Sequence, residues 1–220
     1  MDAEFWHRKW HDNEIGFHMS EANPMLLAYF HRLGLQAGQR VFLPLCGKTR
    51  DIAWLLEQGF AVVGAELSSV AVDQLFNELN IIPRVTEYEA LLHYQGSGPR
   101  GTKLDLFVGD VFLLSANLLG AADALYDRAA LVALPPEMRA QYAEHMLEIS
   151  NRAPQLLITF DYDQSQLAGP PFCVNEAEVR QLYRGMSLQR LASEPVSGGL
   201  KGVCPAQEQV FLLRSATTSA

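Results

Sequence analysis

The chain has 220 residues, enough for one large domain with a buried core or at most two small domains. Its 49% hydrophobic and 19% charged residues are typical of a globular protein, and its formal net charge of −8, without clustered Lys and Arg, argues against nucleic-acid binding. No apolar run approaches the roughly 20 residues that span a bilayer, and the first residues lack a signal-peptide pattern. Three widely spaced cysteines favour reduced thiols, so we expect a cytoplasmic protein with no membrane contact.

A leading segment opens the chain, in which Trp6, Trp10 and Phe17 show some helical spacing. A helix is predicted over about residues 23–33, because proline is favoured in a first helical turn and glycine just beyond a last one. His7 and His11 are four residues apart, a spacing that suits two ligands of one metal, but no third ligand is clearly placed. We interpret them as polar residues of a solvated helix face and expect no metal site.

Strands and helices alternate over the following hundred residues. Apolar runs, rather than alternation, favour strands that are buried on both faces, as in a parallel sheet. The block between Tyr94 and Asp105, whose segment 96–101 is rich in Gly and Pro, is predicted to extend a surface loop that carries no functional residue. Expected strands are 41–45, 61–65, 104–108, 122–126 and 155–160, and expected helices are 49–57, 69–78 and 136–150.

The end of the chain has a different pattern. A helix is expected over 176–183, and strands over 187–194 and 207–214 are separated by a Gly-rich turn. Two strands joined by a loop too short for a crossover helix must pair antiparallel. The sequence therefore predicts one doubly wound α/β domain over residues 1–220, with helices on both faces of a mostly parallel sheet and a frayed tail at 215–220.

The loop in "VFLPLCGKTRD" ends in "GKT", which is also the end of a phosphate-binding loop. That motif requires a first glycine where Phe42 stands, and Pro44 removes a backbone donor, so nucleoside triphosphate binding is disfavoured. Glu66 follows Gly47 by nineteen residues, at the end of the next strand, where a carboxylate can bind the ribose hydroxyls of an adenosine. A loop that binds a dinucleotide would need further glycines to approach the pyrophosphate. S-adenosylmethionine has no pyrophosphate, so one glycine is enough in a loop that binds it. The alternative is that Gly47 makes a turn and Glu66 caps a helix.

Four blocks resemble the thiopurine S-methyltransferase family in the same order. They are "FWHRKWHDNEIGFH", "VFLPLCGKTRDIAWLLEQGFAVVGAELS", "YDRAALVALPP" and "LAGPPFCV", and the similarity runs from residue 5 to about residue 174. The resemblance implies a class I methyltransferase fold, a seven-stranded sheet with an antiparallel last strand, and S-adenosylmethionine as the cofactor.

The resemblance also implies positions for site residues. Residues 1–34 would form a helical lid segment, and Arg128 would reach either the cofactor carboxylate or an anionic acceptor, unless Asp127-Arg128 is an internal ion pair. The stiff apolar turn at 169–172 would form one wall of an acceptor site, although a purely structural turn is an alternative. The expected cofactor-binding residues are Trp10, Leu45, Glu66, Val111 and Arg128, and the expected substrate-binding residues are Phe17, Pro171 and Phe172.

The function that we expect is S-adenosylmethionine-dependent S-methylation of aromatic or heterocyclic thiols such as thiopurines, with selenium and tellurium nucleophiles as further acceptors. Direct transfer to a thiolate needs alignment rather than side-chain chemistry, so no catalytic residue is assigned. The alternatives are an NAD-dependent oxidoreductase and a cofactor-binding module without catalysis. The expected partner is a small-molecule thiol, and the protein is expected to be a monomer.

Overall fold

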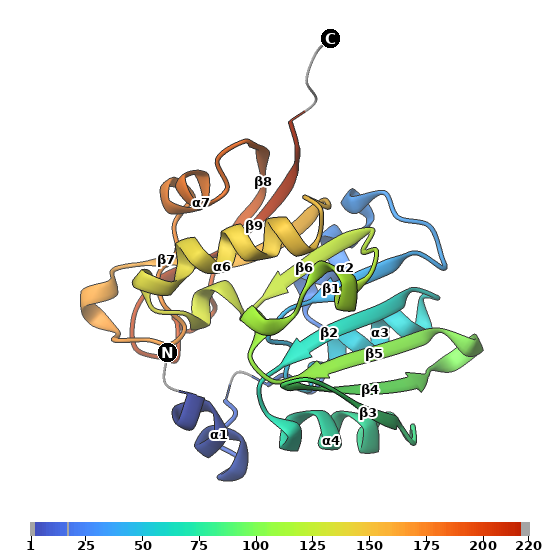
Figure 1. The fold of residues 1–220 in the computed structure, drawn as a ribbon. Coiled ribbons are helices and arrows are strands. Elements are labelled where there is room, and N and C mark those ends of the chain that lie inside the picture. Colours follow the sequence, from blue (N-terminus) through green and yellow to red (C-terminus); the bar gives the residue numbers. More distant parts are fainter. Residues whose placement is uncertain (1–2, 17, 217–220) are drawn as a thin grey trace.

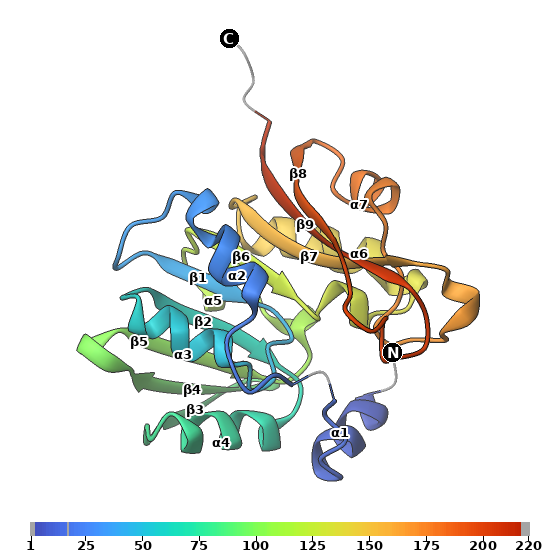
Figure 2. The same ribbon diagram turned by 180° about the vertical axis from the view of Figure 1, so that it is seen from behind.

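Nine strands form one mixed sheet in the computed structural model, which describes residues 3–16 and 18–216. Their order across the sheet is β3-β4-β5-β2-β1-β6-β7-β9-β8, and helices cover both faces (Figures 1 and 2). The strands are β1 (Arg40–Leu43), β2 (Ala61–Glu66), β3 (Arg84–Tyr88), β4 (Leu91–Ser97), β5 (Lys103–Val108), β6 (Ala124–Arg128), β7 (Gln155–Tyr162), β8 (Met186–Pro195) and β9 (Ala206–Ser215).

The helices form two layers, one on each face of the sheet, and each layer packs on its own apolar cluster. Helices α2, α3 and α4 contribute to one cluster, and α5, α6 and α7 contribute to the other. The bounds are α1 (Ala3–His11), α2 (Pro24–Tyr29), α3 (Arg50–Glu57), α4 (Ser69–Glu78), α5 (Ala116–Leu119), α6 (Pro136–Ile149) and α7 (Glu176–Leu182), with short 3-10 turns at Phe30–Leu33, Pro99–Gly101, Val111–Leu113, Leu131–Ala133 and Gln164–Gln166.

Side-chain caps explain where the helices before and after β2 begin. Thr49 accepts a hydrogen bond from the Asp51 amide at the start of α3, and Ser68 accepts one from the Ala71 amide at the start of α4. Asn23 caps α2 in the same way, but the regular α-helix ends at Tyr29 and a 3-10 turn continues it to Leu33. The helix predicted over 23–33 is therefore two short elements.

The sheet has nine strands, so the expected number of seven was wrong. The seven expected strands are present as β5-β2-β1-β6-β7-β9-β8, and β9 is antiparallel to both of its neighbours, as predicted for the terminal hairpin. The two additional strands, β3 and β4, form an antiparallel hairpin, and β4 also pairs antiparallel with β5. Part of the predicted surface loop is therefore strand, because β4 continues to Ser97 and β5 begins at Lys103.

Four parallel strands, β1, β2, β5 and β6, have their carboxyl ends at the same end of the sheet, so the loops that follow them lie together there. β1 lies between β2 and β6 and is parallel to both, and β5 is parallel to β2. The chain leaves β1 towards β2 on one side and reaches β6 on the other, which makes this end a topological switch point, where doubly wound sheets bind ligands. Within the part of the chain that the structure describes, no helix has both the length and the apolar composition that a membrane crossing needs.

Candidate active site

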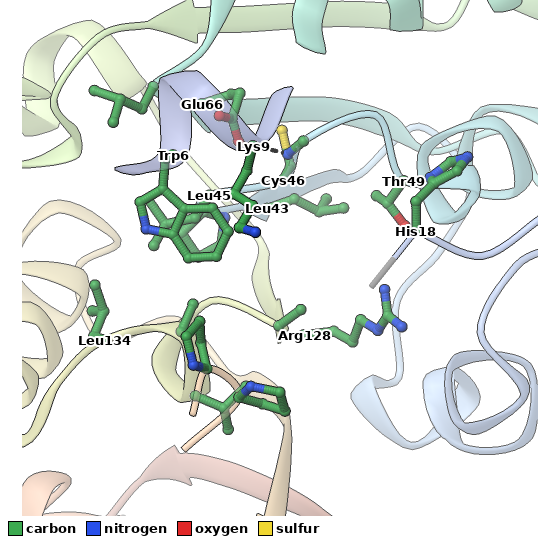
Figure 3. A pocket seen from close by; sticks show the side chains of 18 of the residues that line it. Trp6, Lys9, His18, Leu43, Leu45, Cys46, Thr49, Glu66, Arg128 and Leu134 are labelled. Atoms are coloured by element: carbon green, nitrogen blue, oxygen red, sulfur yellow. Dashed lines mark hydrogen bonds between the residues drawn. The ribbon is translucent and has the colours of Figure 1, made fainter. Parts of the chain in front are cut away.

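A cavity of about 820 Å³ lies at the switch point. Its size is within the range of roughly 300–1,000 Å³ that is typical of small-molecule sites. The loops that follow β1, β2, β5 and β6 line one part, α1 lies over it, and the segment 169–171 with the β8–β9 loop lines another part. Figure 3 shows Leu45 and Glu66 on one side of this space, Leu134 on another, and the indole of Trp6 projecting between them.

The loop after β1 has an unusual backbone, and two predicted residues, Leu45 and Trp10, lie at the cavity here. Leu45 and Gly47 both have a positive φ, of 46° and 53°. A Cβ atom at Gly47 would lie 2.7 Å from a ring carbon of Trp10, so glycine is what allows this loop to contact the indole. Trp10 is only 3% exposed, and all three residues line the cavity. Trp10, which the resemblance places in the cofactor site, is therefore buried against the cavity loop.

Glu66 is buried at the end of β2, and the backbone holds its carboxylate in place. Oε2 accepts a hydrogen bond of 2.7 Å from the Gly47 amide, and Oε1 accepts one of 2.9 Å from the Ser68 amide. Burial raises the pKa of the Glu66 carboxyl, and these backbone hydrogen bonds partly offset the rise. Because each carboxylate oxygen has further lone pairs, Glu66 can also accept from two hydroxyl groups in the cavity.

The same contacts argue against a phosphate at this loop. The Gly47 amide, which a phosphate loop would direct to its ligand, donates instead to Glu66. The ammonium group of Lys48 donates to Glu78 on α4 at 2.8 Å. The loop therefore suits an adenosine that carries no phosphate, such as that of S-adenosylmethionine.

The turn after β5 forms the neighbouring wall. The Gly109 amide donates to the Glu66 carbonyl oxygen at 2.9 Å, which keeps this turn beside the end of β2. Asp110 Oδ1 accepts from the Phe112 amide at 3.0 Å, and the buried Val111 and partly buried Phe112 line the cavity. This wall is apolar and lies next to the Glu66 carboxylate, as an adenine that is attached to a ribose would require.

Arg128 and Asp127 lie on opposite faces of β6, because successive residues of a strand alternate. Asp127 is completely buried and accepts hydrogen bonds from the Leu131 amide at 3.0 Å and the Tyr142 hydroxyl at 2.8 Å. Burial raises the pKa of Asp127 to about 6. Arg128 instead lines the cavity, within electrostatic range of Glu208 and His18. Asp127 therefore has structural partners, and Arg128 faces the site.

The predicted acceptor wall is only partly as expected. Gly169, Pro170 and Pro171 line the cavity, but Phe172 is not among the lining residues. A Cβ atom at Gly169 would lie 2.5 Å from the Phe172 ring, and the Arg139 guanidinium lies over that ring at 5.5 Å. Phe172 therefore supports the wall from behind, because its ring packs on the turn rather than on the cavity. Phe17 lies outside the described residues.

The cavity thus brings together six of the predicted residues, Trp10, Leu45, Glu66, Val111, Arg128 and Pro171. Sequence reasoning missed Lys9 on α1, Lys201 in the β8–β9 loop and Glu208 on β9, which also line it. No local motif marks these positions, and only the pairing register of β9 with β7 could have pointed to Glu208. Among the residues that the structure describes, no group of three or more His, Cys, Asp or Glu is arranged to hold a metal ion.

Comparisons with known proteins identify the family of the chain. The model of the thiopurine S-methyltransferase family matches residues 1–214. A thiopurine S-methyltransferase of Xanthobacter autotrophicus is 51% identical over 98% of this chain and 100% of its own length. One from Teredinibacter turnerae is 49% identical over 97% of each chain.

Solved structures at lower identity show the same fold. The 1,6-didemethyltoxoflavin N1-methyltransferase of Burkholderia thailandensis, solved with S-adenosylhomocysteine, has a TM-score of 0.65 at 18% identity and covers 97% of this chain and 87% of its own. A magnesium protoporphyrin IX methyltransferase of Synechocystis, also with S-adenosylhomocysteine, has a TM-score of 0.64 at 14% identity over 97% and 100%. The chain therefore belongs to the thiopurine S-methyltransferase family, and it is an enzyme that uses S-adenosylmethionine as its methyl donor.

Proposed function

We propose that this methyltransferase acts on the sulfur of aromatic or heterocyclic thiols such as thiopurines. The observation that carries the proposal is that Arg128 and the 169–171 wall bound the same cavity as Glu66. A small aromatic acceptor held between them would lie beside the methyl donor. The oxidoreductase and the non-catalytic module are set aside, because the chain belongs to a family of methyltransferases.

In this proposal the donor is held mainly by its adenosine. Glu66 accepts hydrogen bonds from the two ribose hydroxyls, and its own backbone partners keep it from turning away. Trp10, Leu45 and Val111 supply apolar contacts and exclude water. The donor supplies a methyl group that is already activated by the positive charge of its sulfonium.

The acceptor is held by shape and by charge. Pro171 provides a stiff apolar surface, which Phe172 supports from behind. The guanidinium of Arg128 stabilises the thiolate, which is the nucleophilic form of the acceptor, through its positive charge. A contribution from Phe17 to acceptor binding remains a prediction from the sequence.

A methyl-transfer assay tests the function directly. We expect turnover of a thiopurine and of thiophenol, and none of phenol, because oxygen is a poorer nucleophile and phenol stays protonated at neutral pH. Selenite and tellurite belong in the same panel, since selenium and tellurium acceptors are still a prediction. Binding of S-adenosylhomocysteine without turnover of any thiol would refute the proposed acceptor class.

We also propose that the enzyme works as a monomer in the cytoplasm. The three cysteines are free thiols, as is usual in a reducing compartment. Light scattering should give a mass near that of one 24.4 kDa chain, and a dimer mass would contradict the proposal.

A further inference from the structure

One carboxylate of the cavity differs from the others in having no hydrogen-bond partner. Glu208 lines the cavity from β9, and its side chain makes no hydrogen bond or ion pair with any residue within the described ranges. Every other carboxylate that the structure places in the cavity lining already accepts a hydrogen bond from a described residue. These are Glu14 from Lys9, Asp51 from Asn23 and Tyr126, Glu66 from Gly47 and Ser68, and Asp110 from Phe112.

The sheet register places Glu208 on the same face as Arg128. Arg128 is paired with Ile158 on β7, and Glu208 is paired with Phe160 on the same strand. Paired residues share a face, and Ile158 and Phe160 are two residues apart, so all four side chains lie on one face of the sheet. The guanidinium and the carboxylate therefore flank an apolar floor made by Ile158 and Phe160, which also line the cavity.

The surroundings of Glu208 make it a better proton acceptor than an exposed carboxylate. Burial raises the pKa of the Glu208 carboxyl, Arg128 on β6 lowers it, and Glu194 on β8 raises it. Glu194 is the direct cross-strand neighbour of Glu208, and like charges at such a position repel. The nearby Lys201 donates to the Pro170 carbonyl oxygen at 2.7 Å.

Many heterocyclic thiols exist as thiones, with a proton on the ring nitrogen beside the C=S bond. Methylation of such a sulfur requires that this N–H proton leave, in addition to the transfer of the methyl group. Arg128 can stabilise negative charge on sulfur, but a cation cannot accept the proton. The site therefore needs a proton acceptor on the side of the ring that faces the nitrogen.

We propose that Glu208 accepts the ring N–H proton of heterocyclic thione acceptors while their sulfur is methylated. A bond forms between the acceptor sulfur and the methyl carbon, and the bond from that carbon to the donor sulfur breaks, leaving its electron pair on the donor sulfur. The N–H electron pair forms the C=N bond, the C=S π pair becomes a sulfur lone pair, and the proton passes to the Glu208 carboxylate. This inference rests on the proposed S-methylation and assigns its proton transfer.

The test compares two acceptors that differ in this proton. 2-Thiopyridone carries an N–H, whereas thiophenol has no ring nitrogen and is largely a thiolate at about pH 8. In Glu208→Gln, we expect kcat for 2-thiopyridone to fall at least about tenfold relative to kcat for thiophenol, because a positioned base typically contributes about 100-fold or more. This relative loss of kcat for 2-thiopyridone should become smaller at pH values where 2-thiopyridone ionises in solution. A merely structural role of Glu208 would not produce such a recovery.

Glu194→Gln is the matched control, since it removes the neighbouring carboxylate, which does not line the cavity. Because Glu194 acts only through the pKa of the Glu208 carboxyl, this variant should lower the ratio of kcat for 2-thiopyridone to kcat for thiophenol far less than Glu208→Gln does. Glu208→Asp retains a carboxylate, so its ratio of kcat for 2-thiopyridone to kcat for thiophenol should be higher than that of Glu208→Gln. Equal losses for both acceptors in Glu208→Gln, or a deficit independent of pH, would overturn the inference. Failure of the wild-type enzyme to methylate either acceptor would instead refute the proposed function.

Discussion

At the scale of single residues, Glu66 shows how the backbone prepares a side chain to bind. Its two oxygens accept from amides that belong to different loops, Gly47 after β1 and Ser68 after β2. The carboxylate is therefore oriented before any ligand arrives, and no side-chain freedom is lost on binding. Its burial is tolerated because both oxygens already have partners.

Glu66→Gln should weaken binding of S-adenosylhomocysteine by about 10–100-fold, or about 1–3 kcal/mol. In the wild type, both oxygens of Glu66 accept from backbone N–H groups. A glutamine amide has one acceptor oxygen and an NH2 group with two donors, so in the variant one backbone N–H would face the NH2 group, which cannot accept from it. Titration calorimetry measures the change. Glu57→Gln, at an exposed position of α3, is the control. Equal affinities for both variants would remove Glu66 from the site.

At the scale of elements, a close contact ties α1 to the cavity loop. The indole of Trp10 is buried against Gly47, and this contact links α1 to the β1 loop. Lys9 bridges to Glu14 just beyond the helix, which supports the turn that follows. α1 can therefore complete the cavity only while the loop leaves room for the indole.

Gly47→Ala should displace α1 and weaken donor binding. The added Cβ would lie 2.7 Å from the Trp10 ring, and alanine at a positive φ costs about 1 kcal/mol in addition. Hydrogen exchange should become faster in residues 3–11. Gly34→Ala is the matched control, because Gly34 also has a positive φ but no atom within 4 Å of an added Cβ. If α1 exchanges equally fast in both variants, the contact with Trp10 is not what holds it.

At the scale of the whole molecule, a buried carboxyl links stability to pH. Asp127 lies inside the sheet–helix interface, where it joins β6 to α6 through Tyr142. Because its pKa is raised to about 6 from 3.8, the folded state holds this proton more tightly than the unfolded state does. The contribution of Asp127 to stability is therefore fully present below about pH 4 and is lost as the pH rises through about 6.

Asp127→Asn should abolish that contribution while keeping both hydrogen bonds, since its amide can accept from Leu131 and donate to Tyr142. The unfolding free energy of the wild type minus that of the variant should fall by about 2 kcal/mol between about pH 4 and pH 7. Urea denaturation across this range measures it. Glu137→Gln, at an exposed position of α6, should show a difference constant to within about 0.5 kcal/mol. A difference that is flat or rises with pH for Asp127→Asn would contradict the prediction.

The sequence alone determined the features that depend on local pattern. The unit from β1 through α3 to β2, the cap at Ser68 and the terminal hairpin follow from apolar runs, capping residues and a short connection. Glu66 could be placed because it ends a buried strand at a fixed distance from Gly47. The family resemblance added the remaining cofactor residues.

Only the tertiary structure decided the features that depend on contacts between distant segments. β3 is almost entirely exposed and lacks the continuous apolar run of the buried strands, and it is a strand because β4 offers backbone partners. Phe172 lies behind its wall because Arg139 and Gly169 pack on its ring. Glu208 reaches the cavity through the register of β9 on β7. Neighbouring residues along the chain do not set such a register, since it results from pairing between strands that are far apart in sequence.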